Sequence, residues 1–93
     1  MISDVVFRVG TFLEELLKYS GAEEVILISR RYYLNESQTM DVAKCDYTLG
    51  RIYYGLAKYV ESERKLLESK ELYIKEQGKL YFIVITSLNN FRR

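Results

Sequence analysis

The chain has 93 residues, with 14 Lys and Arg against 13 Asp and Glu, and a net charge of +1. It contains no His and one Cys, which excludes a His-based catalytic triad, a histidine metal site and a cysteine pair within this sequence. Hydrophobic residues make up 48% and charged residues 29%, a balance typical of a folded domain. We expect one domain spanning residues 1–93.

Apolar runs and the single cysteine bear on where the protein works. The longest runs, Val25–Ile28 and Leu80–Ile85, are far shorter than the about 20 residues of a membrane helix. No basic stretch followed by an apolar segment opens the chain, as a secretory signal would require. Unpaired Cys45 suits a reducing compartment. We therefore expect a cytoplasmic protein without a membrane partner.

A first helix is expected near the N-terminus. Ser3 or Asp4 can cap its start, and Ser20-Gly21 can stop it after about Tyr19. Its apolar residues recur at three- and four-residue spacing, which places them on one face. They are Ile2, Val5, Val6, Val9, Phe12, Leu13, Leu16 and Leu17.

Residues 22–35 admit either a strand or a helix. Val25–Ile28 is an uninterrupted and mostly β-branched apolar run, which favours a strand buried on both faces. The alternative is a helix over Glu23–Tyr33, because its acidic start and its Arg30-Arg31 end would suit the helix dipole. The strand is the favoured of the two.

A long helix is expected after a loop at residues 35–37. It would cover Thr39–Ser69, with a break near Asp46-Tyr47 or at Gly50 left open. Its apolar residues share one face at helical spacing. They are Leu49, Ile52, Tyr53, Leu56, Val60 and Leu67.

The last part of the chain predicts a β-hairpin. Apolar and polar residues alternate over Glu71–Glu76, Gln77-Gly78 can form a tight turn, and Leu80–Leu88 can return as the second strand. The predicted fold class is therefore a small α+β domain in the order helix, strand, long helix, β-hairpin. Its two layers would leave one sheet face exposed, and we identify no internal repeat.

The exposed sheet face predicts a protein interface. In the expected hairpin Tyr73, Tyr81, Ile83 and Ile85 gather on the face that the helices do not cover. Monomeric proteins rarely expose so large an apolar patch. A closed monomer with a helix over each face stays open as an alternative. A dimer, or a subunit of a larger protein assembly, is favoured because the long helix outreaches its sheet.

Basic and aromatic residues at helical spacing suggest possible nucleic-acid contacts. Arg and Lys interleaved with Tyr could track a phosphate backbone, as could the lysines that flank the hairpin. The residues are Arg51, Tyr54, Lys58, Lys65, Lys75 and Lys79. A solvated helix face laced with Glu–Lys pairs is the favoured explanation, and nucleic acid is only weakly supported as a partner.

Catalytic groups are absent from this pattern. Glu14-Glu15 and Glu23-Glu24 lack the His or clustered Asp that a metal or an acid–base site would need, and Cys45 has no neighbouring base. We expect no enzyme, no catalytic residue, no cofactor and no metal site.

The N-terminal third resembles the opening of a Roadblock/LC7 domain. The resemblance lies in Phe12–Lys18, a helix end at Ser20-Gly21, and the apolar run within Ala22–Arg30. Arg31-Tyr32-Tyr33 replaces the usual Asp-Gly turn of that family, and its fifth strand is missing. Membership would imply a homo- or heterodimeric scaffold, often for small GTPases or motors.

A second resemblance is to the winged helix. Ile28–Thr39 or Asp41–Tyr53 would be the helix-turn-helix, and Leu72–Ile85 the wing. A winged-helix protein would bind duplex DNA, and the near-zero net charge argues against this. The sequence thus predicts a non-enzymatic protein-interaction module, a dimer or an accessory subunit of a larger intracellular and possibly nucleic-acid-handling complex. A winged-helix DNA-binding transcriptional regulator is the alternative.

Overall fold

The computed structural model describes the backbone of residues 2–91 and the side chains of residues 2–79. Four α-helices follow one another through this range: α1 (Ile2–Glu15), α2 (Tyr19–Asn35), α3 (Thr39–Gly55) and α4 (Tyr59–Phe91). No strand occurs within residues 2–91. The predicted α+β fold with an exposed sheet face is therefore wrong, and so are both family resemblances, since each requires strands.

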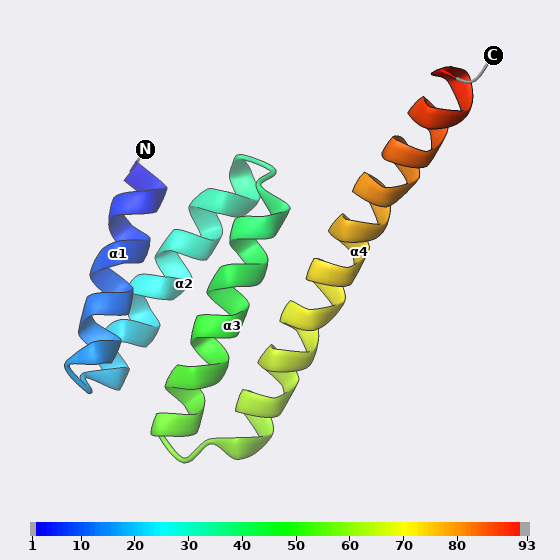
Figure 1. Ribbon diagram of the computed structural model, residues 1–93. Helices are drawn as coiled ribbons and strands as arrows, with labels where there is room; N and C mark the ends of the chain where they lie inside the picture. Colours follow the sequence, from blue (N-terminus) through cyan, green and yellow to red (C-terminus); the bar gives the residue numbers. More distant parts are fainter. Residues whose placement is uncertain (1, 92–93) are drawn as a thin grey trace.

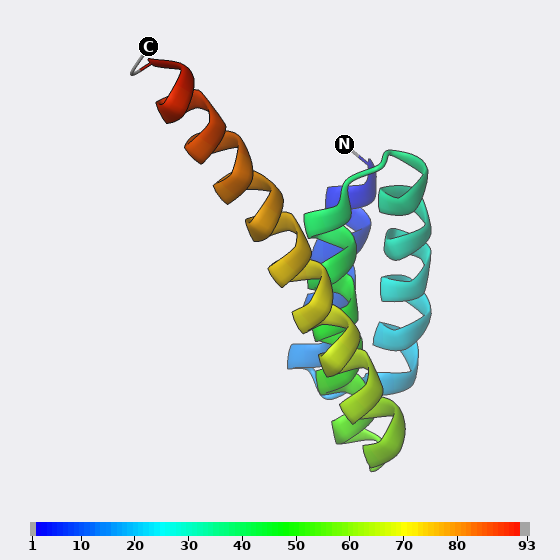
Figure 2. The same ribbon diagram turned by 90° about the vertical axis from the view of Figure 1, so that its right-hand side faces the viewer.

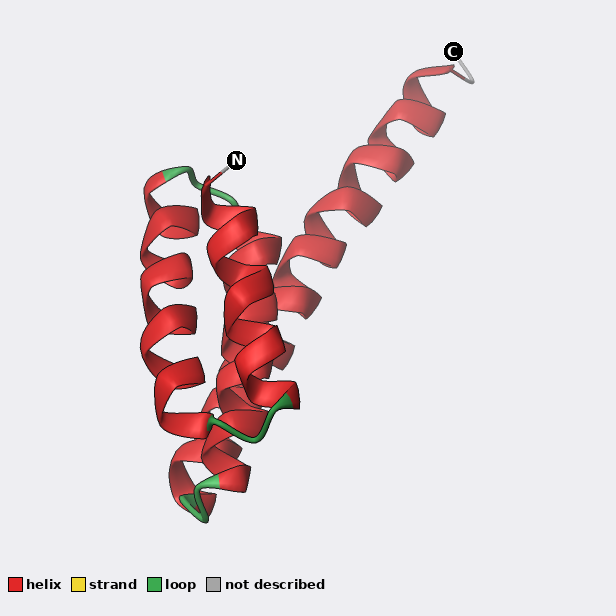
Figure 3. Cartoon of the chain, turned by 90° about the vertical axis from the view of Figure 1, so that its left-hand side faces the viewer, coloured by secondary structure: helices red, strands yellow, loops and turns green. Residues whose placement is uncertain are grey.

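The helices run up and down as antiparallel neighbours (Figure 1). Each packs against the next along the chain, and α1 touches α3 only slightly. Seen from the side, the first part of α4 lies across α3, and the later part of α4 extends beyond the other helices (Figure 2). Three short loops join the helices (Figure 3). The molecule is accordingly elongated, with extents of 56 × 30 × 20 Å.

Helix α2 corrects the favoured strand at residues 22–35. Ala22, Ile26, Ser29 and Tyr33 are buried, and their spacing of three and four residues is that of one helix face. The apolar run that suggested a strand is split between environments, because Ile26 is fully buried while its neighbours Leu27 and Ile28 are about half exposed. A β-branched run does not exclude a helix whose buried stripe is set by tertiary packing.

The remaining boundaries also differ from expectation. The first helix is confirmed, although it ends at Glu15. The expected helix over Thr39–Ser69 is two helices, separated at residues 56–58 rather than near Asp46 or at Gly50. The predicted hairpin is wrong, because α4 continues without a turn through Gln77-Gly78. The alternation of Leu72 and Ile74 is too short to outweigh the helical stripe of Leu66, Ser69 and Leu72 that precedes it.

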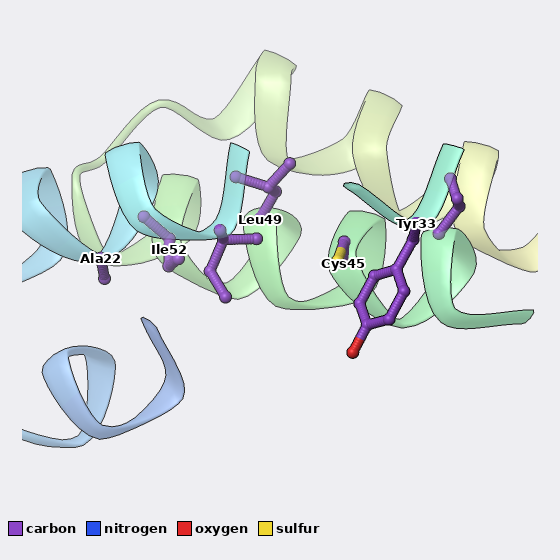
Figure 4. Close-up of a cluster of buried hydrophobic side chains, with 7 residues drawn as sticks. Ala22, Tyr33, Cys45, Leu49 and Ile52 are labelled. Atoms are coloured by element: carbon purple, nitrogen blue, oxygen red, sulfur yellow. The ribbon is translucent and has the colours of Figure 1, made fainter. Parts of the chain in front are cut away.

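The core lies mainly between α2 and α3. Ala22 and Tyr33 of α2 meet Cys45, Leu49 and Ile52 of α3 (Figure 4). All five are at most 2% exposed. Because α2 also packs on α1, and α3 on α4, these two central helices are the only pair in the described part of the chain with a helix neighbour on each side.

Candidate interaction surfaces

The three loops have the same geometry at a spacing of 20 residues. Leu17, Ser37 and Ala57 each adopt a left-handed conformation, with φ of 60°, 56° and 60°. In each loop this residue and the next donate backbone N–H groups to the preceding helix, as in Ala57 to Tyr54 O at 3.0 Å and Lys58 to Tyr53 O at 2.8 Å. The helices that follow begin at residues 19, 39 and 59. The chain is therefore built from one helix–turn unit used repeatedly.

Packing within the α1–α2 hairpin recurs in the α3–α4 hairpin, 40 residues later. Gly10 lets the side chain of Ile26 approach so closely that a Cβ would overlap it. Gly50 does the same for Leu66, where an added Cβ would lie 2.6 Å from the nearest atom. Both glycines serve a close approach of two helices, because a Cβ at either position would overlap the facing side chain where it now lies.

Hydrogen bonds between the helices repeat at the same interval. The Ser29 hydroxyl of α2 donates to the Ser3 carbonyl of α1 at 3.0 Å. The Ser69 hydroxyl of α4 donates to the Ala43 carbonyl of α3 at 2.8 Å. The structure thus contains one helical hairpin twice, and the expectation of no internal repeat is wrong.

The repeat has a sequence signal that was overlooked. Several residues recur identically 40 positions apart, which a self-comparison at that interval detects. The recurring pairs are Gly10 and Gly50, Leu16 and Leu56, Lys18 and Lys58, Tyr19 and Tyr59, Glu23 and Glu63, Leu27 and Leu67, Ser29 and Ser69, Tyr33 and Tyr73, and Glu36 and Glu76.

Helix α1 carries an apolar face without a neighbouring helix in the described residues. We call Ile2, Val5, Val9 and Phe12 the α1 stripe; its side chains are 47–69% exposed. The residues 40 positions later, on α3, are Val42, Cys45, Leu49 and Ile52, and they are at most 3% exposed. The difference arises because α2 covers the face of α3, whereas no described helix covers that of α1. The α1 stripe is therefore a candidate interaction surface.

Helix α4 also carries a surface that no described helix covers. Side chains from the end of α3 and the start of α4 line a groove with a volume of about 400 Å³. We call it the α4 groove; its lining residues are Tyr54, Tyr59, Ser62, Glu63, Leu66, Leu67 and Lys70. No described helix covers Leu66, which is 39% exposed. Its counterpart in α2, Ile26, is fully buried beneath α3.

A buried charge fixes how the hairpins meet. The carboxylate of Asp46, only 1% exposed, accepts a hydrogen bond from Arg30 Nε at 2.7 Å, so that α3 is tied to α2. Lys65 Nζ of α4 lies 3.7 Å from the same Asp46 oxygen, Oδ1. An unpaired carboxylate in this buried position would destabilise the fold, so Asp46 requires cationic side chains opposite it.

Two further contacts shape the α2–α3 interface. The ring of Tyr19 lies where a Cβ on residue 55 would be, so Gly55 is required opposite it. Burial, and then hydrogen bonding to the Glu23 carboxylate, raise the pKa of Tyr53 to about 12. Glycine, tyrosine and aspartate of α3 thus meet tyrosine, glutamate and arginine of α2.

The predicted nucleic-acid contacts do not form one cationic surface. Arg51 donates to the Glu14 carboxylate, which raises the pKa of its guanidinium, and Lys79 pairs with Glu76 at 3.2 Å. Lys65 pairs with Asp46 and with Glu68, the latter at 3.1 Å. Of the other three, Tyr54 stacks edge-on against Tyr59, Lys58 lies over the Tyr53 ring and Lys75 borders a different pocket. Internal pairing occupies much of the charge that a phosphate backbone would need.

The predicted protein interface is not assembled on a sheet. Tyr73 is half-buried on α4. Tyr81, Ile83 and Ile85 belong to the last part of α4, and their side chains lie outside the described residues. The physical basis of that prediction, alternation of faces along a strand, does not apply to a helix.

The described side chains contain neither a metal-binding cluster nor an exposed thiol. No cluster of three or more metal-ligating Cys, Asp or Glu side chains occurs among residues 2–79. Cys45 is buried, and this burial raises the pKa of its thiol to about 11, which disfavours the reactive thiolate. None of the described helices is both long enough and apolar enough to cross a bilayer.

Comparison with known proteins links the chain to helical repeats. It is 39% identical over 89 residues to a TPR repeat-containing protein of Dictyostelium discoideum. The match covers 96% of this chain and 5% of that protein, so the chain spans a small part of its relative. No family model matches, and no solved structure matches.

The spacing of the TPR pattern is present in the α3–α4 hairpin. That pattern runs Trp-x2-Leu-Gly-x2-Tyr, followed by Ala-x3-Phe. Here Leu49, Gly50 and Tyr53 occupy the matching positions, Ser62 and Leu66 replace the Ala and Phe, and Asp46 replaces the Trp. The interval between hairpins is longer than the about 34 residues of a typical TPR. This spacing is hard to recognise in the sequence, because the apolar run at Val25–Ile28 and Gln77-Gly78 on either side of it suggest a strand and a hairpin.

Proposed function

We propose that this chain is a non-catalytic protein-interaction module, a pair of TPR-like helical hairpins that acts by packing against other protein. The observation that carries the proposal is the contrast between two equivalent faces. The α1 stripe is about half exposed, whereas its counterpart on α3 is buried by α2 of the preceding hairpin. In stacked repeats each hairpin buries its apolar face only against a neighbour, so an uncovered face is a site for protein contact.

The similarity to a TPR repeat-containing protein supports this function, since repeats of that kind stack into extended binding surfaces. Assembly as a dimer or as an accessory subunit of a larger complex is part of the proposal. The α1 stripe, rather than a sheet face, is the contact surface in either case. Its four side chains are wholly apolar, which suits an interface with a helix better than one with a charged ligand.

The test is a pair of substitutions on the α1 stripe. We expect Val9→Ser with Phe12→Ser to leave the helical circular dichroism and the melting temperature of the isolated chain nearly unchanged, because both side chains are already exposed. The same variant should lose concentration-dependent association in sedimentation velocity, or binding to any partner retained by the wild type. Arg8→Ser, an exposed change beside the stripe, is the matched control and should keep both.

Two results would contradict this function. One is a wild-type chain that stays monomeric and binds no other protein under any condition tested. The other is association that the double variant and Arg8→Ser affect equally.

A further inference from the structure

The α4 groove and the covered face of α2 present the same side chains. Counting back 40 residues from the groove gives Tyr19 for Tyr59, Ala22 for Ser62, Glu23 for Glu63, Ile26 for Leu66 and Arg30 for Lys70. Aromatic, small, acidic, aliphatic and basic character is kept at these five positions, and Leu67 corresponds to Leu27, whereas Tyr54 corresponds to Glu14. The groove is thus a second example of the surface on which α2 receives α3.

We propose that the α4 groove binds a helix that resembles α3 and carries Asp, Tyr and Gly at positions i, i+7 and i+9. Helix α1 of a second copy of this chain is not that helix. This inference deepens the proposed function, on which it rests, by naming the kind of partner and the surface.

The pattern follows from the contacts that α3 makes with α2. Its three members are Asp46, Tyr53 and Gly55. Asp46 is bonded to Arg30, so an equivalent aspartate would face Lys70. The hydroxyl of Tyr53 lies beside Glu23, so an equivalent tyrosine would face Glu63. Gly55 makes room for Tyr19, so an equivalent glycine would make room for Tyr59.

Helix α1 of a second copy does not fit this groove. Its residues at the three positions are Val6, Leu13 and Glu15. Val6 would leave Lys70 without a carboxylate, and Leu13 would set an apolar side chain against Glu63. A Cβ on Glu15 would overlap Tyr59 as a Cβ on residue 55 would overlap Tyr19. Head-to-tail stacking of identical chains is disfavoured by all three, an example of specificity obtained from mismatches.

The path of α4 also places the partner elsewhere in the protein or on another chain. Helix α2 ends at Asn35, and the loop that follows returns the chain so that α3 covers α2. Helix α4 instead continues as a helix through the equivalent position, residue 75, and on to Phe91. No loop at that point brings a helix back onto the groove (Figure 1).

The experiment measures binding of a labelled peptide to the intact chain by fluorescence anisotropy. The peptide copies residues 39–58, and a staple between positions 47 and 51, both exposed on α3, keeps it helical. We expect saturable binding. A peptide copying residues 2–18 of α1, stapled at the equivalent positions 7 and 11, should bind at least about tenfold more weakly, which corresponds to about 1.4 kcal/mol.

Charge reversal then locates the binding site. Lys70→Glu in the chain should weaken the α3 peptide at least about fivefold, the value of one good ion pair. The same peptide with Asp46→Lys should recover affinity for that variant. Lys75→Glu is the matched control, because Lys75 is exposed on the same helix but does not line the groove. It should leave binding unchanged.

Three results would overturn the inference: no saturable binding of the α3 peptide, equal binding of the α1 peptide, or equal effects of Lys70→Glu and Lys75→Glu. The proposed function is tested separately, at the α1 stripe. If the α3 peptide does not bind but the chain still associates through the α1 stripe, this inference is rejected and the proposed interaction function is retained.

Discussion

Asp46 joins the two hairpins through a buried ion pair with Arg30. It is almost completely buried, and its partners Arg30 and Lys65 come from the helices on either side of α3. Removing the carboxylate would leave Arg30 without its ion-pair partner, and Lys65 would keep only Glu68. We expect Asp46→Ala to lower the free energy of unfolding in urea by about 3 kcal/mol. Asp41→Ala, which removes the loose 3.9 Å pair with Lys44 and the acidic side chain in the first turn of α3, should cost less than about 1 kcal/mol. Equal losses would show that Asp46 does not join the helices.

The left-handed loop residues store conformational strain. Ala57 has a φ of 60°, which costs an L-residue about 1–2 kcal/mol relative to glycine. Glycine also gains freedom in the unfolded chain, so the net effect of Ala57→Gly should be a stabilisation of about 0.5 kcal/mol. Thermal melting would detect it as a small rise in melting temperature. A fall in melting temperature would mean that this loop does not hold the turn described above.

The buried thiol makes stability depend on alkaline pH. Burial raises the pKa of Cys45 from about 9 to about 11, so the unfolded state loses its thiol proton first as the pH rises. The unfolded state then binds fewer protons than the folded one, and stability falls with pH between these values. We expect a loss of about 1 kcal/mol from pH 8 to pH 10 in urea titrations. Cys45→Ala should remove most of this loss; an unchanged slope would contradict the assignment.

The two interhelical glycines, Gly10 of α1 and Gly50 of α3, should respond differently to substitution by alanine. An added Cβ at Gly10 would press on Ile26, which is fully buried, whereas at Gly50 it would press on Leu66, which can swing into the open α4 groove. Overpacking typically costs about 1–3 kcal/mol, and alanine returns about 1 kcal/mol in helix propensity. Gly10→Ala should therefore be less stable than Gly50→Ala by about 1 kcal/mol in urea denaturation.

The internal control for this comparison is Gly21. Its added Cβ would meet only Leu13, at an ordinary contact distance of 3.8 Å. Gly21→Ala should consequently stabilise α2 by up to about 1 kcal/mol. Equal effects of alanine at Gly10 and Gly50 would argue that the groove beside Leu66 is closed in solution.

The elements show which physical signals the sequence carries openly. The first helix was predictable because its stripe keeps helical spacing from Ile2 to Phe12. Residues 25–28 were misjudged because a β-branched run indicates burial but not which neighbour provides it. The C-terminal hairpin was misjudged because Gly78 satisfied the requirement for a turn, although in α4 nothing lies near it.

Tertiary contacts decided what local patterns did not. The loops at residues 17, 37 and 57 contain no glycine or proline at the turning position, so the usual turn signals are absent. The 40-residue recurrence was the signal that overrides these local ambiguities, because a repeated sequence implies a repeated unit. The α4 groove and the pairing of Asp46 could follow only from placing that unit twice in space.

The whole molecule is a short stack in which each helix depends on the one beside it. Stacked repeats gain stability from their neighbours, and a terminal helix that lacks one exposes the surface that an inner helix buries. The α1 stripe and the α4 groove are the two exposed ends of this stack. The proposed interaction with further protein would use the same kind of contacts that hold the fold together.

The most direct measurement lengthens the stack by one helix of its own sequence. Fusing a copy of residues 19–40 ahead of Met1 places Ile2 in the position that Val42 holds after α2. With Tyr19→Ala, Glu23→Leu and Arg30→Leu in the copy, which remove the mismatches with Glu15, Leu13 and Val6, the added helix should cover the α1 stripe, and the free energy of unfolding should rise by several kcal/mol, at about 25 cal/mol per Å² of apolar surface buried. The same extension with Ile26→Lys in the copied helix should give no rise. Equal stability of the two extended chains would contradict the account that α1 presents the open face of a repeating stack.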